Sequence, residues 1–176
     1  MFKNIVFVGG IHGVGKGHFC QKIRLGVGFE YLSASEVINW SKIKENPHDK
    51  RVDDIKHTQE LLIEGLKARV EAKKQYLLDG HFCLFNAEGK INKVPKETFR
   101  KIAPRLLITV TKPPEVILQQ QKNRAGLVYE LSTLQRMQEI EIAYSEELSQ
   151  ALDIPLIIIK DQAPTVVINQ IKQQIK

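Results

Sequence analysis

A lysine that follows closely spaced glycines near the N-terminus points most directly to chemistry in this sequence. From Gly10 the chain reads Gly-Ile-His-Gly-Val-Gly-Lys-Gly, which fits seven of the eight positions of the Walker A pattern G-x-x-x-x-G-K-[ST]. Gly10, Gly13 and Gly15 allow backbone conformations that other residues avoid, and they bring successive N–H groups toward one centre. A helix that begins at Gly15 or Lys16 adds its positive dipole end, so we expect a polyphosphate there.

The phosphates of a nucleotide are therefore expected on this loop, with Lys16 reaching the β- and γ-phosphates. The residues assigned to this binding are Gly10, His12, Gly13, Val14, Gly15, Lys16, Gly17 and His18. Gly17 departs from the pattern, because it stands where a Ser or Thr hydroxyl normally holds Mg²⁺. A glycine-rich turn that binds nothing is the alternative, but a preceding apolar strand and a following helix pattern favour nucleotide binding.

A second candidate residue, Asp79, ends a short apolar run over residues 75–78. Ligands of open α/β sheets bind outside the carboxyl ends of the strands. Asp79 should therefore reach the same edge as the glycine-rich loop and orient Mg²⁺ through water. The alternative is that Asp79 caps a helix or forms the turn before Gly80. His81 carries less weight, since a lone histidine beside Phe82 is often packed in a core.

The elements that must position these residues alternate between apolar strands and amphipathic helices. Continuous apolar runs predict strands near residues 5–8, 29–32, 76–79, 105–111 and 154–159. Helical patterns cover residues 16–25, 33–43, 54–73, 95–102, 113–123, 132–152 and 164 onward, with a turn or hairpin at 85–91. Ser33 and Glu36 have the spacing of a capping box. We predict a three-layer α/β P-loop fold, a five-stranded parallel sheet with helices on both faces, in a single domain over residues 1–176.

Composition and charge favour a small phosphorylated ligand. The 176 residues include 26 basic and 20 acidic side chains, a net charge of +6, and the basic residues are scattered rather than massed in an arm or stripe. Nucleic acid is therefore not the expected partner, although a protein partner stays open. Cys20 and Cys83 are too few for a disulfide framework. No apolar run approaches the ~20 residues of a membrane span, and the first strand leaves no room for a signal peptide, so we expect a cytoplasmic protein.

On these residues the chain resembles the P-loop nucleoside monophosphate kinases, and most of all the archaeal-type adenylate kinases. The resemblance extends over nearly the whole chain and rests on four segments, which are residues 9–16, 31–36, 78–81 and the 88–90 turn followed by Pro95. It implies an ATP-dependent kinase that transfers the γ-phosphoryl group to a nucleoside monophosphate, with Mg²⁺ as the cation. It further implies an acceptor-side insertion at about 33–73 and a short lid at about 122–130.

The resemblance also assigns roles to particular residues. The acceptor would be bound by Ser33, Glu36, Arg51 and His81, and the catalytic residues would be Lys16, Asp79 and Arg124. Arg51 lies among basic residues that suit either an acceptor phosphate or a solvated loop. The chain offers Arg124 and Arg136 for the transferring phosphate, where the lid of the family usually supplies several arginines. The small number of arginines and the glycine at position 17 leave two alternatives to a nucleoside monophosphate kinase. One is an ATP-binding regulatory protein with weak or no kinase activity, and the other is a kinase of another small metabolite.

Overall fold

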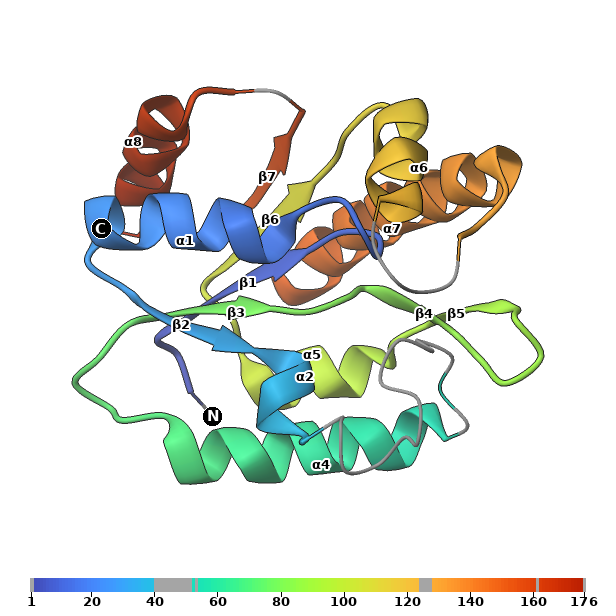
Figure 1. Ribbon diagram of the computed structural model, residues 1–176. Helices are drawn as coiled ribbons and strands as arrows, with labels where there is room; N and C mark the ends of the chain where they lie inside the picture. The colour runs from blue at the N-terminus through green and yellow to red at the C-terminus, as the bar shows by residue number, and fades with distance from the viewer. Residues whose placement is uncertain (1, 40–51, 53, 124–127, 161, 176) are drawn as a thin grey trace.

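The computed structural model describes every residue except 1, 40–51, 53, 124–127, 161 and 176. Five strands form one parallel sheet in the order β2-β3-β1-β6-β7 (Figure 1). They are β1 (Ile5–Gly9), β2 (Glu30–Ser33), β3 (Tyr76–Asp79), β6 (Leu106–Val110) and β7 (Leu156–Ile159). The predicted five-stranded parallel sheet is confirmed.

The central strands are buried along their whole length. Every residue of β1 and of β6 is buried, which is typical of parallel strands covered on both faces. In the register of the sheet, Val8 pairs with Asp79 and Gly9 with Thr109. The carboxyl ends of β1, β3 and β6 therefore meet at one edge, where the glycine-rich loop begins.

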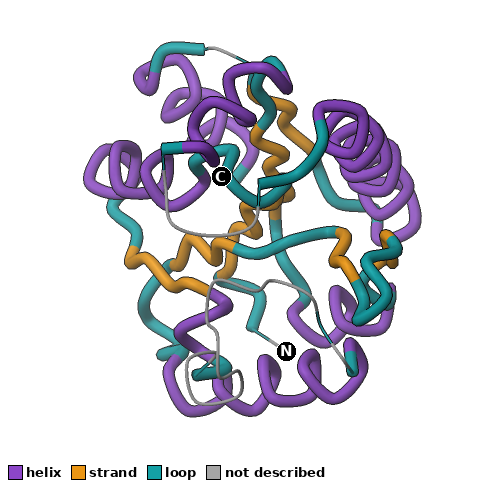
Figure 2. Tube along the Cα trace, turned by 45° about the vertical axis from the view of Figure 1, so that its right-hand side comes forward, coloured by secondary structure: helices purple, strands orange, loops and turns teal. Residues whose placement is uncertain are grey.

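Helices cover both faces of the sheet. On one side α1 (Lys16–Val27) packs against α8 (Pro164–Gln174), and on the other lie α4 (Ile55–Arg69) and α5 (Lys96–Ile102) (Figure 1). Figure 2 shows the strands running between these helices. The remaining helices are α2 (Ala34–Val37), α6 (Pro114–Lys122) and the long α7 (Leu131–Leu152).

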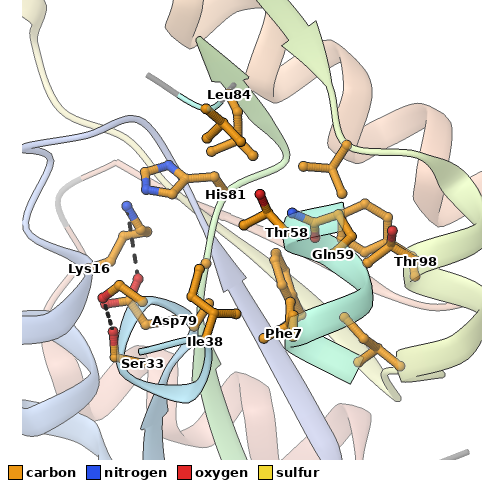
Figure 3. A pocket seen from close by; sticks show the side chains of 18 of the residues that line it. Phe7, Lys16, Ser33, Ile38, Thr58, Gln59, Asp79, His81, Leu84 and Thr98 are labelled. Atoms are coloured by element: carbon orange, nitrogen blue, oxygen red, sulfur yellow. Dashed lines mark hydrogen bonds and ion pairs between the residues drawn. The ribbon is translucent and has the colours of Figure 1, made fainter. Parts of the chain in front are cut away.

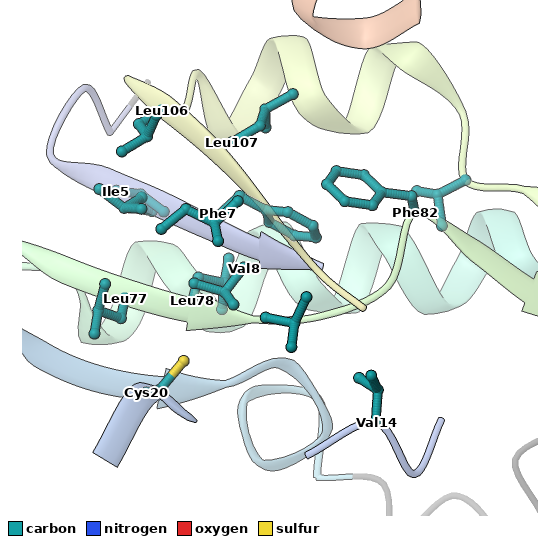
Figure 4. Packing of buried hydrophobic residues seen from close by; sticks show 14 of the residues in the cluster. Ile5, Phe7, Val8, Val14, Cys20, Leu77, Leu78, Phe82, Leu106 and Leu107 are labelled. Carbon is teal, nitrogen blue, oxygen red and sulfur yellow. The ribbon is translucent and has the colours of Figure 1, made fainter. Parts of the chain in front are cut away.

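Aromatic rings join β1 to the helices beneath it. The ring of Phe7 lies 5.2 Å from the rings of both Phe82 and Phe99, and Phe99 lies 6.4 Å from Tyr144. Figure 4 shows Phe7 and Phe82 side by side among the buried residues. Since Phe99 belongs to α5 and Tyr144 to α7, these helices lie on the same face of the sheet. The Tyr144 hydroxyl donates a hydrogen bond to the Val94 carbonyl at 2.6 Å.

A small hairpin follows β3, as the sequence predicts. It consists of β4 (Cys83–Phe85) and β5 (Ile91–Lys93), which pair antiparallel. Gly89 takes a φ of 74° in the turn, a conformation that glycine adopts without steric cost. Cys20 and Cys83 are both free and buried.

Three local predictions are wrong. The helix predicted over residues 33–43 is shorter, because α2 ends at Val37 and Asn39 takes a φ of 54°; residues 40–43 lie outside the described residues. Ser33 precedes α2, but its side chain makes no capping bond, and its Oγ instead lies 2.9 Å from Ser35 Oγ. Helix α4 ends at Arg69 rather than near residue 73, because Val70 is extended. Tertiary contacts stabilise this earlier end. The Tyr76 hydroxyl accepts from the Glu71 N–H and donates to the Arg69 carbonyl, which α4 leaves free.

The helices that the structure describes include none with both the length and the apolar character needed to cross a membrane.

Candidate phosphate-binding site and acceptor cavity

The glycine-rich loop connects β1 to α1 in the conformation that a nest of N–H groups requires. Gly10, Gly13 and Gly15 have φ values of 145°, 86° and 96°. A Cβ on Gly10 would lie 2.5 Å from the Val110 carbonyl oxygen, so this position also needs glycine for space. Helix α1 begins at Lys16, with Gly15 as its N-cap. The loop and the helix N-terminus therefore have the geometry of an anion-binding centre at the edge of the sheet.

Lys16 is held over this loop by backbone oxygens. Its side chain is 7% exposed, and its Nζ donates to the carbonyls of Gly10 at 3.0 Å and Ile11 at 3.3 Å. The same nitrogen lies 3.9 Å from Asp79 Oδ1 (Figure 3). A phosphate in the nest would find this ammonium already in position.

Asp79 lies at the end of β3 and faces Lys16. Its Oδ2 accepts a hydrogen bond from the Tyr31 hydroxyl at 3.1 Å. Burial raises the pKa of Asp79 above its usual value, although Lys16 and the Tyr31 hydrogen bond oppose that shift. The Gly80 N–H donates to the Val8 carbonyl at 3.0 Å, so the chain continues along β1 here. No described helix begins at Asp79, which removes the helix-cap alternative.

A cavity of about 220 Å³ opens beside these two residues. At one end lie Lys16, Asp79, Ser33, His12 and His81, as Figure 3 shows for most of them. Three polar side chains of α4 and α5 line it farther along, Thr58, Gln59 and Thr98. Its other walls are mainly apolar and include Phe7, Ile38, Val52, Leu62, Leu84, Val94, Phe99 and Ile102. The cavity thus joins a charged end to an apolar chamber.

Glu141 is a buried acid beside this cavity that the sequence analysis did not identify. Its side chain is 1% exposed and accepts hydrogen bonds from the N–H groups of Phe82 at 3.2 Å and Cys83 at 3.1 Å. Burial raises its pKa to about 7, and one oxygen lies 3.9 Å from His81 Nδ1. Glu141 therefore fixes the backbone of the segment that carries His81. The sequence does contain a signal for its burial, because Glu141 lies seven residues after Leu134 and seven before Leu148, on the buried stripe of α7.

Two further polar residues lie against the loop on the side of α6. Gln121 is 5% exposed, and its amide donates to the His12 carbonyl at 3.0 Å and accepts from the Tyr129 N–H at 3.3 Å. Lys112 brings a second ammonium to the loop, since its Nζ lies 3.3 Å from the place where a Gly15 Cβ would stand. The amide of Gln138 bonds both the N–H and the carbonyl of Lys112. No local pattern in the sequence indicates these contacts.

The other predicted site residues are distributed unevenly. Ser33 and His81 line the cavity together with Lys16 and Asp79, whereas Glu36 is exposed and absent from the lining. His18 is also exposed, and the Val14 side chain is buried in the core, so only the backbone of Val14 is suited to phosphate. Two predicted residues fall outside the described residues, Arg51 and Arg124.

The oxygen donors beside Lys16 fit Mg²⁺ bound together with a nucleotide. Mg²⁺ in phosphoryl-transfer sites is held by one or two carboxylates, substrate phosphates and water. Asp79 supplies one carboxylate, and the Tyr31 hydroxyl lies next to it. In the described part of the chain, no three His, Cys, Asp or Glu side chains are grouped so that they could hold a metal by themselves. The set therefore suits a cation that arrives with ATP rather than a metal held by protein alone.

The parallel sheet, the glycine-rich loop and the buried Lys16 define the P-loop class of nucleotide-binding domains. A family model described as an AAA domain, AAA_17, matches residues 9–138, and the chain belongs to this family and so to the P-loop kinase group. No curated protein matches the chain in sequence.

Two solved structures share the fold. An unliganded sugar kinase from Janibacter sp. HTCC2649 is 18% identical, with a TM-score of 0.56 over 98% of this chain and 94% of that one. A gluconokinase from Sinorhizobium meliloti 1021 is 11% identical, with a TM-score of 0.57 over 99% of this chain and 92% of that one. At these identities the likeness shows the fold.

Proposed function

We propose that the protein is an ATP-dependent kinase that transfers the γ-phosphoryl group to a nucleoside monophosphate. The observation that carries this proposal is that the phosphate-binding loop and the acceptor cavity meet at the same two side chains. Lys16 and Asp79 stand at the phosphate loop and also line the cavity that extends away from it. A donor phosphate on the loop and an acceptor in the cavity would thus meet at these two side chains.

The proposed roles of Lys16, Asp79, Ser33 and His81 agree with their positions around the cavity, and those of Arg51 and Arg124 rest on the resemblance to nucleoside monophosphate kinases. The loop N–H groups and Lys16 hold the ATP phosphates, and Asp79 holds Mg²⁺ through water. When bound, Mg²⁺ neutralises charge on the phosphate oxygens. Arg124 is proposed to cover the transferring group, and Ser33, Arg51 and His81 to bind the acceptor phosphate. An acceptor that is already a phosphate anion needs no protein base to remove a proton.

The walls of the cavity favour a nucleobase over a polyhydroxylated acceptor. A sugar presents a hydroxyl on nearly every carbon, and each one buried without a partner costs about 1–3 kcal/mol. The described chamber beyond Ser33 is mainly apolar, and the polar side chains that line it are those of Ser35, Thr58, Gln59 and Thr98. A flat ring suits such walls, and the amide of Gln59 offers both a donor and an acceptor to the edge of a base.

A kinase of another small metabolite is the second candidate, because a sugar kinase and a gluconokinase share the fold. A hydroxyl acceptor would need a group to take its proton. Asp79 is suited to that role, since burial raises its pKa.

The test is a panel of acceptors incubated with Mg²⁺-ATP, in which ADP formation is measured for each. We expect the largest rate with one or more nucleoside monophosphates, and background rates with gluconate and other sugar acids or with no acceptor. Lys16→Ala serves as the control for contaminating kinases and should abolish the signal. A rate that rises only with a hydroxylated metabolite would favour the second candidate. ATP binding without turnover on any acceptor would favour a regulatory protein.

A further inference from the structure

Gly17 has no conformational reason to be glycine. It is the second residue of α1 and is absent from the positive-φ glycines, so its backbone conformation is open to any residue. Glycine destabilises a helix relative to alanine. The space beside it explains its presence instead. A Cβ at this position would lie 3.2 Å from the Tyr31 hydroxyl oxygen and 3.5 Å from Asp79 Oδ2.

The Tyr31 hydroxyl thus occupies the space toward which a side chain at position 17 would point. In the Walker pattern, a Ser or Thr hydroxyl at that position faces the magnesium ion together with the carboxylate of a neighbouring strand. Here the hydroxyl comes from β2, and it donates to Asp79 Oδ2 at 3.1 Å while Asp79 Oδ1 faces Lys16. Both oxygens of Asp79 are therefore oriented by a partner.

We propose that Tyr31 supplies the hydroxyl that Gly17 lacks and positions Asp79 for the magnesium ion of Mg²⁺-ATP. This inference rests on the proposed ATP-dependent function. The phenol O–H donates its hydrogen bond to Asp79 Oδ2, and its oxygen retains acceptor capacity for a further ligand.

The hydrogen bond from Tyr31 to Asp79 is not needed to hold β2 against β3. The backbone of β2 already pairs with β3 from Glu30 with Tyr76 to Ser33 with Asp79. Gly17 on α1 and the Tyr31 hydroxyl on β2 instead suggest that β2 provides the hydroxyl group that α1 provides in the Walker pattern.

The experiment measures ATP binding by calorimetry with and without Mg²⁺, in the absence of any acceptor. Four proteins are compared, the parent chain, Tyr31→Phe, Gly17→Ser and the double variant Tyr31→Phe/Gly17→Ser. The readout is the factor by which Mg²⁺ increases ATP affinity. We expect Tyr31→Phe to reduce this factor about tenfold, as for a lost hydrogen bond to a charged group, and to leave metal-free ATP binding unchanged.

The double variant tests directly whether a hydroxyl at position 17 can replace the Tyr31 hydroxyl. With the phenolic oxygen removed, a serine at position 17 has room for its hydroxyl, and we expect it to restore most of the Mg²⁺ effect. Gly17→Ser alone should give no gain, because its Cβ meets the Tyr31 oxygen at 3.2 Å. Tyr76→Phe is the matched control. Its hydroxyl bonds the backbone of residues 69 and 71, so it should lower the melting temperature without changing the Mg²⁺ effect.

Several results would overturn the proposal. These are an unchanged Mg²⁺ effect in Tyr31→Phe, a double variant no better than Tyr31→Phe, and a gain from Gly17→Ser alone. A parent protein that binds ATP equally with and without Mg²⁺ would also overturn it, while leaving nucleotide binding intact. A parent protein that binds no ATP at all would overturn the proposed function and this inference together.

Discussion

Replacing Glu141 with glutamine should change how the stability of the protein depends on pH. Burial raises the pKa of Glu141 from 4.5 to about 7 in the folded protein, whereas the unfolded chain exposes this carboxyl to water. Below pH 4.5 the group is protonated in both states. Between pH 4.5 and 7 the unfolded chain releases the proton first, so rising pH favours unfolding. The stability that protonated Glu141 contributes is therefore fully lost above the pKa of the folded protein.

The size of this effect follows from the two pKa values. Each difference of one in pKa corresponds to about 1.4 kcal/mol, so Glu141 should lower the free energy of unfolding by roughly 3 kcal/mol between pH 4.5 and pH 7. Glutamine cannot ionise and removes that dependence. It keeps one acceptor oxygen for the Phe82 and Cys83 N–H groups, and the N–H left without a partner costs about 1–3 kcal/mol. The variant should therefore be less stable near pH 5 and equal or more stable near pH 8.

Urea unfolding followed by circular dichroism from pH 4.5 to 8 measures this difference directly. Glu146→Gln is the matched control, because it makes the same change on the exposed side of α7. It should leave the pH profile of the parent protein unchanged. If the stability difference between Glu141→Gln and the parent stays constant across this range, Glu141 ionises as in water and the reasoning from burial is refuted.

Three further substitutions test the loop and the sheet edge. Lys16→Ala should weaken ATP binding tenfold or more in calorimetry, since it removes the ammonium at the β- and γ-phosphates, and Lys22→Ala on the exposed side of α1 should not. Asp79→Asn should keep metal-free ATP binding but reduce the Mg²⁺ effect about tenfold, and unfolding of the variant would instead indicate a structural role. Gly9→Ala should lower the free energy of unfolding by about 1–3 kcal/mol, because its Cβ would stand 2.1 Å from the Phe82 ring; an unchanged urea midpoint would show that the ring moves aside.

The sheet and the loop could be predicted because their signals are local. Continuous apolar runs mark strands buried on both faces, and the spacing of Gly10, Gly13 and Gly15 ahead of Lys16 specifies the loop without reference to any other segment. The prediction that Asp79 would lie at the same edge needed only the rule that parallel strands end together. The structure brings it within 3.9 Å of Lys16.

The remaining features depend on which segments become neighbours. Tyr31 lies on an edge strand, and only the packing of α1 against β2 and β3 shows that its hydroxyl fills the space beside Gly17. Glu141 lies on a helical stripe between apolar residues, where a carboxylate is expected to be unfavourable. Its two backbone donors come from residues 82 and 83, far away in the sequence. The helical periodicity could predict that position 141 is buried, but it could not identify the N–H groups that bond its carboxylate.

The amide of Gln121 has a mechanical consequence for the nucleotide loop. One end of the amide bonds the His12 carbonyl in the loop, and the other bonds the Tyr129 N–H, where the chain returns toward α7. Tyr129 is itself stacked on Phe85 of the hairpin, with ring centroids 4.8 Å apart. A displacement of the chain at Tyr129 must therefore pull on the loop or break a bond worth about 1 kcal/mol. Through these contacts, Gln121 and Tyr129 connect the nucleotide loop to the hairpin.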